Sequence, residues 1–171
     1  QVLALARRHG MQPVIAGGAE AWLVATELAA AKAAVVLDPL VNLPASFDAL
    51  GARLDNAARL QRAGVVVVFS MTGLAPHFAH KVRQLAGNAV AHGMPWDAAL
   101  AALTANPAAV FGLGASRGRI EAGLVADLVL WSGDPLEVTS AADQVWVGGK
   151  PMSMRSRQTE LLDRYLPQAA R

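Results

Sequence analysis

Five residues have side chains and positions that suit chemistry near the end of a strand. Two acids and an imidazole can hold a proton or a metal, and two hydroxyls can attack a carbonyl or orient a water molecule. They are Glu20, Asp38, His77, Ser70 and Thr72. Parallel α/β proteins place their sites at the carboxyl ends of strands, so we take these five as candidates at the edge of a site.

Each candidate also has a structural interpretation. Asp38 precedes a proline, where Asp commonly forms a turn with nearby backbone, and we favour that role. Glu20 begins a predicted helix, where the helix dipole stabilises an acid. No His and acid pair lies close in sequence to Ser70 or Thr72 to activate a hydroxyl. The sequence therefore assigns no catalytic role to these residues.

Metal ligands are sparse in this sequence, which has four histidines and no cysteine. His77 and His80 share one helix face, but no carboxylate accompanies them at matching spacing, and Lys81 directly follows His80. His9 and His92 are expected at the ends of surface helices. We therefore predict no metal site and no cofactor within this chain.

Short apolar runs alternate with helical patterns over most of the chain, which predicts parallel strands joined by right-handed crossovers. Strands are expected at 12–16, 34–37 and 65–69, and helices at 20–32, 47–63, 78–91 and 98–103, the last capped by Asp97. The run at 65–69 is apolar on both faces, which is typical of a strand buried between layers.

The pattern changes near residue 118 to short extended segments closed by Gly or Pro. These are expected at 119–123, 126–131, 144–147 and 151–154, and Gly148-Gly149 suits a tight hairpin turn. An antiparallel element is therefore predicted. The tail at 155–165 is predicted to be a surface helix with Leu161, Leu162 and Tyr165 facing inward.

Composition narrows the class of protein. The 171 residues are 54% hydrophobic and 16% charged, against about 25% charged in an average domain, so we expect another part of a protein to cover some surface. The net charge of +2, without a long basic block, argues against nucleic-acid binding. No apolar run approaches the roughly 20 residues that cross a membrane. A cytoplasmic, periplasmic or secreted location stays open.

The chain starts inside a helical pattern that has no cap, so we expect it to be the C-terminal piece of a longer protein. Another hypothesis concerns Gly17-Gly18, which lies between the first predicted strand and its helix, where two glycines are also ordinary turn residues. A strand-to-helix turn of this kind can bind phosphate, as in a free-standing doubly wound nucleotide-binding module. The pattern falls short of the full dinucleotide fingerprint, and no acid is placed to hold a ribose.

Several segments together form an ordered set that resembles the C-terminal end of the amidohydrolase superfamily, in particular its imidazolonepropionase-like branch. The segments are Leu103-Thr104-Ala105-Asn106-Pro107-Ala108, Gly112-Leu113, the run from Gly118 to Leu130, and Val145-Trp146-Val147-Gly148-Gly149-Lys150. Further segments are also similar to that branch, namely residues 17–22, 37–39, 46–50, 53–57, 156–159 and 163–165. The resemblance therefore covers nearly the whole chain.

The resemblance implies an α/β fold, namely the C-terminal part of a (β/α)8 TIM barrel, with about three βα units, plus antiparallel strands of a small β-sandwich. Residues 1–117 would belong to the barrel, 118–154 to the sandwich, and 155–171 to a tail helix. The segments 11–16, 34–37 and 65–69 would be barrel strands six, seven and eight. Asp127 looks like a structural turn acid.

The resemblance also implies a parent hydrolase that uses zinc or another divalent metal to attack a C–N bond other than a peptide bond. Strand six should end in a His and strand eight in an Asp, but here they end in Ala16-Gly17-Gly18 and Phe69-Ser70-Met71. Two hypotheses follow. One is a fragment of such a hydrolase, inactive alone, and the other is a non-catalytic relative with a binding or subunit role.

The partners that follow from this interpretation are the missing N-terminal part of the same protein and, in the parent, a small-molecule substrate. Neither nucleic acid nor a membrane is expected as a partner. Open sheet edges and the low charge also allow self-association into a homo-oligomer.

Overall fold

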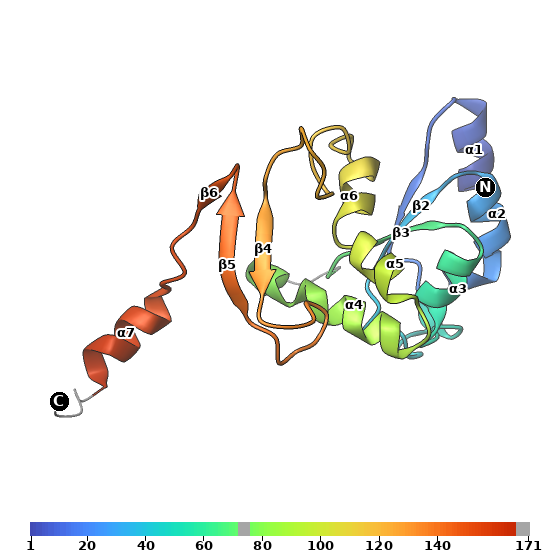
Figure 1. Ribbon diagram of the computed structural model, residues 1–171. Coiled ribbons are helices and arrows are strands. Elements are labelled where there is room, and N and C mark those ends of the chain that lie inside the picture. Colours follow the sequence, from blue (N-terminus) through green and yellow to red (C-terminus); the bar gives the residue numbers. More distant parts are fainter. Residues whose placement is uncertain (72–75, 167–171) are drawn as a thin grey trace.

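A computed structural model describes residues 1–71 and 76–166, apart from the side chains of 76–78. Figure 1 shows an α/β body in the N-terminal two-thirds, a small second sheet beside it, and a C-terminal helix beyond that sheet. Among the described residues, no helix is long and apolar enough to span a membrane.

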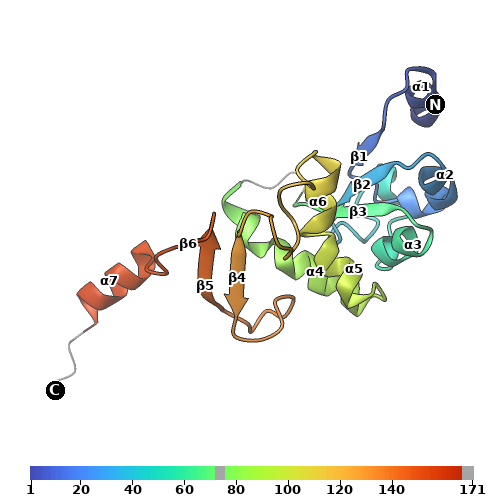
Figure 2. The same ribbon diagram turned by 45° about the horizontal axis from the view of Figure 1, so that its top comes forward.

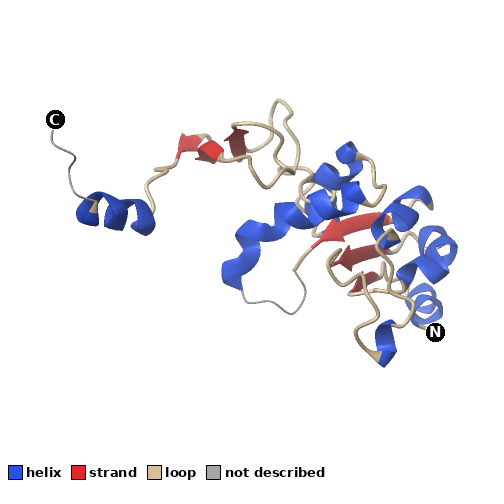
Figure 3. Cartoon of the chain, turned by 90° about the horizontal axis from the view of Figure 1, so that it is seen from below, coloured by secondary structure: helices blue, strands red, loops and turns tan. Residues whose placement is uncertain are grey.

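Three short strands form a parallel sheet in the order β1-β2-β3. The strands are β1 (Val14–Ala16), β2 (Ala34–Leu37) and β3 (Val66–Phe69). Val14, Ala34 and Val66 lie side by side in the register. The parallel alternation predicted from the apolar runs is confirmed, and the strands lie side by side in Figure 3.

The helices that connect and follow these strands are short. They are α1 (Val2–Arg8), η1 (Ala21–Val24), α2 (Ala25–Ala30), η2 (Phe47–Ala49), α3 (Asn56–Arg62), η3 (Pro76–Lys81), α4 (Val82–Ala91), α5 (Trp96–Ala101) and α6 (Ala105–Val110). Helix α1 ends as expected, with His9 as its C-cap and Gly10 in the left-handed region at φ +61°.

The apolar core lies on one face of the parallel sheet. Ile15, Val35, Leu37, Val67 and Phe69 pack there against residues of α2 to α5. On the opposite face, the side chains are valine and alanine only, and Val14 and Val66 remain 45% and 42% exposed. A doubly wound module has helices on both faces. In the part of this chain that the structure describes, the core helices lie on one face of the sheet only.

The helix predicted over 47–63 is wrong as a single element. The chain instead forms the short turn η2, runs through turns and loop to Asp55, and begins α3 at Asn56. Residues 51–56 do not continue a helix because they form hydrogen bonds with the segment after β1 instead. Gly51 bonds to Glu20 and Trp22, and Asn56 bonds to Trp22. Asp97 is also not a cap, because α5 already begins at Trp96, with Pro95 in the N-cap position.

An antiparallel sheet follows, in the order β4-β5-β6. It comprises β4 (Leu128–Trp131), β5 (Ala142–Val147) and β6 (Lys150–Pro151). Gly148 and Gly149 form the hairpin turn with φ of +57° and +77°, which confirms the predicted turn. The extended segment predicted at 119–123 is wrong, because no strand forms there and residues 122–124 lie in turns and a bend.

Asp127 fastens this hairpin. Its Oδ1 accepts a hydrogen bond from the Gly148 N–H at 2.8 Å, and its Oδ2 pairs with Arg117. The backbone beside it also takes part, since the Gly149 N–H donates to the Ala126 carbonyl at 2.9 Å. The structural role predicted for Asp127 is therefore confirmed.

The loop between β4 and β5 docks onto the α/β body. Arg83 of α4 donates to the carbonyl oxygens of Pro135 at 3.1 Å and Ser140 at 2.8 Å, and its guanidinium lies 5.0 Å from the centre of the Trp131 ring. Leu136 inserts into the core with 5% exposure. The second sheet is thus attached through both polar and apolar contacts.

The C-terminal helix α7 (Arg157–Tyr165) begins with a capping box, in which Ser156 and Thr159 bond each other's backbone. The prediction that Leu161, Leu162 and Tyr165 face inward is wrong: these side chains are 37%, 55% and 74% exposed. Figures 1 and 2 show why, because α7 stands away from both sheets.

The contact between α4 and the docked loop can be tested at Gly87. A Cβ on this residue would lie 2.5 Å from the Leu136 carbonyl oxygen, closer than atoms can approach. Gly87→Ala is expected to lower the free energy of unfolding by about 1–3 kcal/mol, even though Ala favours a helix. Urea unfolding measures this, with Gln84→Ala on the same helix as a control. A Gly87→Ala chain as stable as the control would contradict the contact.

Candidate functional site

The carboxyl ends of the three parallel strands meet at one edge of the sheet, and three of the five candidates follow them. Glu20 lies after β1, Asp38 directly after β2, and Ser70 directly after β3. The register pairs Leu37 with Phe69, which puts Asp38 and Ser70 at equivalent positions on neighbouring strands. The structure therefore brings these three candidates to the same edge.

Glu20 holds a loop. It is partly buried in the N-cap position of η1, and its Oε1 accepts a hydrogen bond from the Gly51 N–H at 2.5 Å. A Cβ on residue 51 would come within 3.1 Å of that oxygen. This carboxylate therefore joins the loop after β1 to the long segment between β2 and α3.

Asp38 makes the turn that its sequence context suggests. The residue is 6% exposed, and its Oδ1 accepts a hydrogen bond from the Leu40 N–H at 3.0 Å. The Asp38 carbonyl also accepts from the Val41 N–H at 3.0 Å. A buried carboxylate at a strand end keeps a second oxygen for other uses, so a site role stays a prediction.

Ser70 extends the sheet by one step, since its N–H donates to the Leu37 carbonyl at 3.1 Å, and the residue is partly exposed. Thr72 lies outside the described residues. His77 falls in η3, but its side chain is outside the described part as well. Whether His77 pairs with the hydroxyl of Ser70 or Thr72 therefore lies outside what the described residues show.

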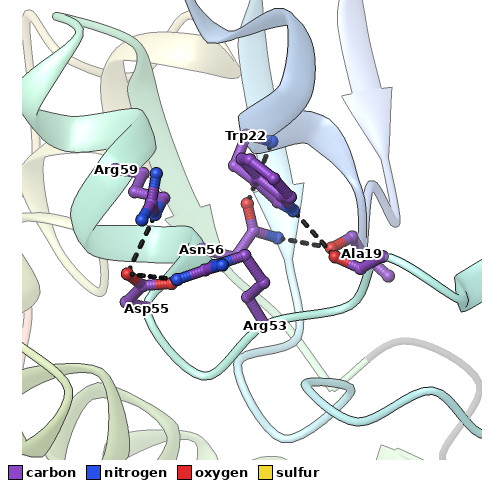
Figure 4. A network of polar contacts seen from close by, with 7 residues as sticks. Ala19, Trp22, Arg53, Asp55, Asn56 and Arg59 are labelled. Atoms are coloured by element: carbon purple, nitrogen blue, oxygen red, sulfur yellow. Dashed lines mark hydrogen bonds and ion pairs between the residues drawn. The ribbon is translucent and has the colours of Figure 1, made fainter.

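Asn56 is the residue at this edge that the sequence patterns did not single out. It lies in the first turn of α3 and is 4% exposed, and the hydrogen bonds of its side chain amide join α3 to the segment that follows β1. Its Nδ2 donates to the carbonyls of Gly18 at 2.9 Å and Ala19 at 3.1 Å, and its Oδ1 accepts from the Trp22 N–H at 3.2 Å. Figure 4 shows this arrangement.

Trp22 continues the same network. Its indole Nε1 donates to the Gly51 carbonyl at 2.8 Å, and the guanidinium carbons of Arg53 and Arg59 lie 5.0 and 5.1 Å from the centre of its ring. Cations at this distance from an indole face are attracted by its π electrons. We call Glu20, Trp22, Gly51 and Asn56 the loop-locking network.

Asp55 holds the two arginines in place. Its carboxylate pairs with Arg53 Nε at 2.7 Å and with Arg59 Nε at 2.9 Å. The hydrogen bond from Arg53 is the main reason that the pKa of Asp55 lies well below its usual range, and the hydrogen bond from Arg59 adds to it. The carboxylate in turn raises the pKa of Arg53.

A sequence signal for Asn56 exists in hindsight. Asn is disfavoured inside a helix because its side chain competes for backbone hydrogen bonds, yet the predicted helix over 47–63 contained it near its middle. An Asn at that position indicates a helix boundary. The identity of its partners depends on which loop lies opposite.

The chain shows sequence similarity to known proteins over much of its length. A sequence profile of the Amidohydrolase family matches residues 63–152, just over half of the chain. The chain belongs to the amidohydrolase family. The branch within the family that the sequence motifs favour is not distinguished by this match, and it stays a prediction.

Individual relatives agree with this family. The chain is 48% identical over 58 residues to the amidohydrolase tasK of Hapsidospora irregularis, which is 34% of this chain and 6% of that protein. A solved amidohydrolase from Thermotoga maritima is 30% identical, with a TM-score of 0.79, over 90% of this chain and 40% of that one.

More distant structures share the fold. An adenosine deaminase from Xanthomonas campestris with bound zinc superposes with a TM-score of 0.62 at 22% identity, over 94% of this chain and 43% of its own. In each of these solved structures, this amidohydrolase chain spans less than half of the relative's length.

The edge residues do not by themselves fit the metal centre that the family resemblance implies. Within the described ranges, no three His, Cys, Asp or Glu side chains gather closely enough to hold an ion. β1 is followed by Gly17 and β3 by Ser70, where the family pattern expects metal ligands. Both nearby acids already accept a backbone N–H. No catalytic step through a metal follows from these residues.

Removing the amide of Asn56 tests the loop-locking network. Asn56→Ala leaves two carbonyls and one N–H without their partner in a buried place, so the free energy of unfolding is expected to fall by about 1–3 kcal/mol. Urea unfolding measures the loss. Arg62→Ala, an exposed change on the same helix, serves as the control and should alter stability by less than about 0.5 kcal/mol. Equal effects of the two variants would contradict a locking role.

The ion pairs of Asp55 predict a pH dependence. The native pKa of Asp55 lies below the unfolded value of about 3.9, so its carboxylate stabilises the native state at neutral pH, and that contribution is lost as the pH falls below about 4. The stability difference between the native chain and Asp55→Asn should be largest near pH 6 and shrink toward pH 3. A difference that does not change with pH would contradict this prediction.

Proposed function

We propose that this chain is the C-terminal part of an amidohydrolase-type hydrolase that acts on a C–N bond other than a peptide bond, and that it is inactive by itself. The observation that carries the proposal is the match to the Thermotoga maritima amidohydrolase, which extends over 90% of this chain but only 40% of that one. Barrel enzymes draw their catalytic side chains from several strands. The three parallel strands of this chain supply too few of these side chains for catalysis.

In this proposal the parallel sheet is an arc of a (β/α)8 barrel, with β1, β2 and β3 as its sixth, seventh and eighth strands. The core helices lie on one face of the sheet, as in a barrel wall. The opposite face carries only valine and alanine, which suits the side-chain layers that fill a barrel interior. Residues 1–117 form the barrel part, 118–154 the sandwich strands and 155–171 the tail.

The residues of this chain would bind and orient a small-molecule substrate. The loop-locking network fixes two consecutive βα loops at the catalytic edge, which supplies a rigid wall for a pocket. Asp38 and Ser70 stand at that edge and can accept or donate hydrogen bonds to a bound molecule. Zinc or another divalent metal, if the parent uses one, would be held by ligands from the N-terminal part that this chain lacks.

A second candidate is a non-catalytic relative that keeps the barrel for binding or for pairing with another subunit. One observation favours it: the residues after β3 are Ser70 and Met71, so the end of that strand presents a hydroxyl and a thioether instead of an acid. A neutral hydroxyl does not accept a proton from an attacking water as a carboxylate does.

The proposal is tested by comparing the longer protein with this chain. Both are assayed against a panel of small amides, lactams and cyclic imides, with elemental analysis of the bound metal. The longer protein is expected to hydrolyse at least one C–N substrate, and this chain none. Turnover by the chain alone would overturn the claim that it is inactive, and a longer protein that binds panel compounds without hydrolysing any would favour the second candidate.

A further inference from the structure

Asp38 is a buried carboxylate at the carboxyl end of the central strand β2. The residue is 6% exposed, and within the described ranges no cation forms an ion pair with it. Its Oδ1 accepts the Leu40 N–H at 3.0 Å, whereas its Oδ2 has no hydrogen-bond partner among those residues. Every fully enclosed side-chain oxygen in the described part of the chain has a partner, so Oδ2 must be open to water.

The turn at Asp38 does not account for this second oxygen. The sequence Asp-Pro-Leu occurs twice, at 38–40 and 134–136, and both copies form the same turn. In the second copy the exposed Asp134 uses both oxygens, because Trp96 Nε1 lies 3.0 and 2.9 Å from them. An Asn makes such a turn as well as an Asp does. The turn therefore explains Oδ1 of Asp38, but not a buried carboxylate with a free oxygen, which costs free energy.

Strand alternation places Asp38 on the face of the sheet that the core helices leave uncovered. Leu37 packs into the core, so the next residue, Asp38, falls on the opposite face. Phe69 also packs into the core and pairs with Leu37, so Ser70 falls beside Asp38 on that same face. In the proposed barrel this face lines the interior, and the carboxyl ends of the strands are where barrel enzymes bind their substrates.

The position beside Asp38 is the one where the family resemblance predicts an acid. This chain has Ser70 there, and a hydroxyl does not accept a proton from an attacking water as a carboxylate does. Neighbouring strands lie about 4.8 Å apart, so Asp38 offers a carboxylate one strand spacing away from the expected place.

Glu20 is the other acid at this edge, and it is less suited to the same task. It lies beyond the end of β1, in the N-cap position of η1, so it is not level with Ser70. Its Oε1 accepts the Gly51 N–H and joins two loops. Of these two acids, Asp38 is therefore the one that stands directly at a strand end.

We propose that Asp38 is the proton acceptor for hydrolysis, in place of the acid that the family pattern expects after β3. The inference rests on the proposed function, which supplies the reaction. Oδ2 takes a proton from water as the water oxygen bonds to the carbonyl carbon of the substrate. The proton then passes to the nitrogen as the C–N bond breaks, so a carboxylic acid and an amine leave and the Asp38 carboxylate is restored. The hydrogen bond from Leu40 to Oδ1 keeps the carboxyl group oriented.

Kinetics of the longer protein with two matched variants test this role. Asp38→Asn keeps an oxygen for the Leu40 N–H but cannot accept a proton, and Asp134→Asn makes the same change in the second Asp-Pro-Leu turn. On a C–N substrate that the native longer protein hydrolyses, Asp38→Asn should lower kcat by roughly 100-fold or more, and Asp134→Asn by less than about twofold. Equal kcat values for the native protein and Asp38→Asn would overturn the assignment.

Two further measurements separate a lost proton acceptor from a damaged fold. The urea midpoint of Asp38→Asn should match that of the native longer protein, because the turn is kept. Asp38→Ala leaves room for a small carboxylate, so added formate should raise its kcat without raising that of the native protein. A kcat of Asp38→Asn that falls only in step with its urea midpoint, without rescue of Asp38→Ala by formate, would contradict the proposal.

These outcomes distinguish the role of Asp38 from the proposed function. A native longer protein that hydrolyses no C–N substrate would remove the proposed function and the role of Asp38 with it. A native longer protein that hydrolyses its substrate as fast after Asp38→Asn would remove the role of Asp38 alone.

Discussion

Burial of both faces of a parallel sheet is the constraint on which the rest of this structure depends. Parallel strands are stable when apolar layers cover them on each side, and here helices supply that layer on one side only. The other side consists of valine and alanine, and it is half-exposed at Val14 and Val66. The chain has only 16% charged residues, and it spans 40% of the length of the amidohydrolase from Thermotoga maritima.

Polar side chains complete the structure where helices and strands do not satisfy the backbone. Asn56 and Arg83 each donate hydrogen bonds to the carbonyls of a loop. Asn106 donates to a carbonyl of β3, and Asp127 accepts from an N–H of the β5–β6 hairpin. Buried or partly buried peptide groups need partners, and in loops those partners must come from side chains. Each of these residues joins segments distant in sequence, so together they hold the short helices and the two sheets in one arrangement.

Local patterns predicted the repeating elements well and the contacts between them poorly. The strands ending at Ala16, Leu37 and Phe69 were predicted because an apolar run and its terminating residues lie next to each other in sequence. The helix expected over 47–63 failed because its apolar spacing continues through residues 51–55, where tertiary hydrogen bonds hold turns and loop instead. The inward face expected for the tail failed at Tyr165, since amphipathic spacing does not say whether a surface lies opposite.

The sequence by itself determined the parallel strands, the change to an antiparallel hairpin at Gly148-Gly149, and the family, because each depends on residues adjacent along the chain. Only the tertiary structure decided that Glu20 holds a loop, that Asn56 locks two loops together, and that Asn106 binds the Val67 carbonyl of β3. The physical reason is the range of the interaction. A turn or a strand is specified within a few residues, whereas a side chain acquires its role from whichever backbone group folding brings within about 3 Å of it.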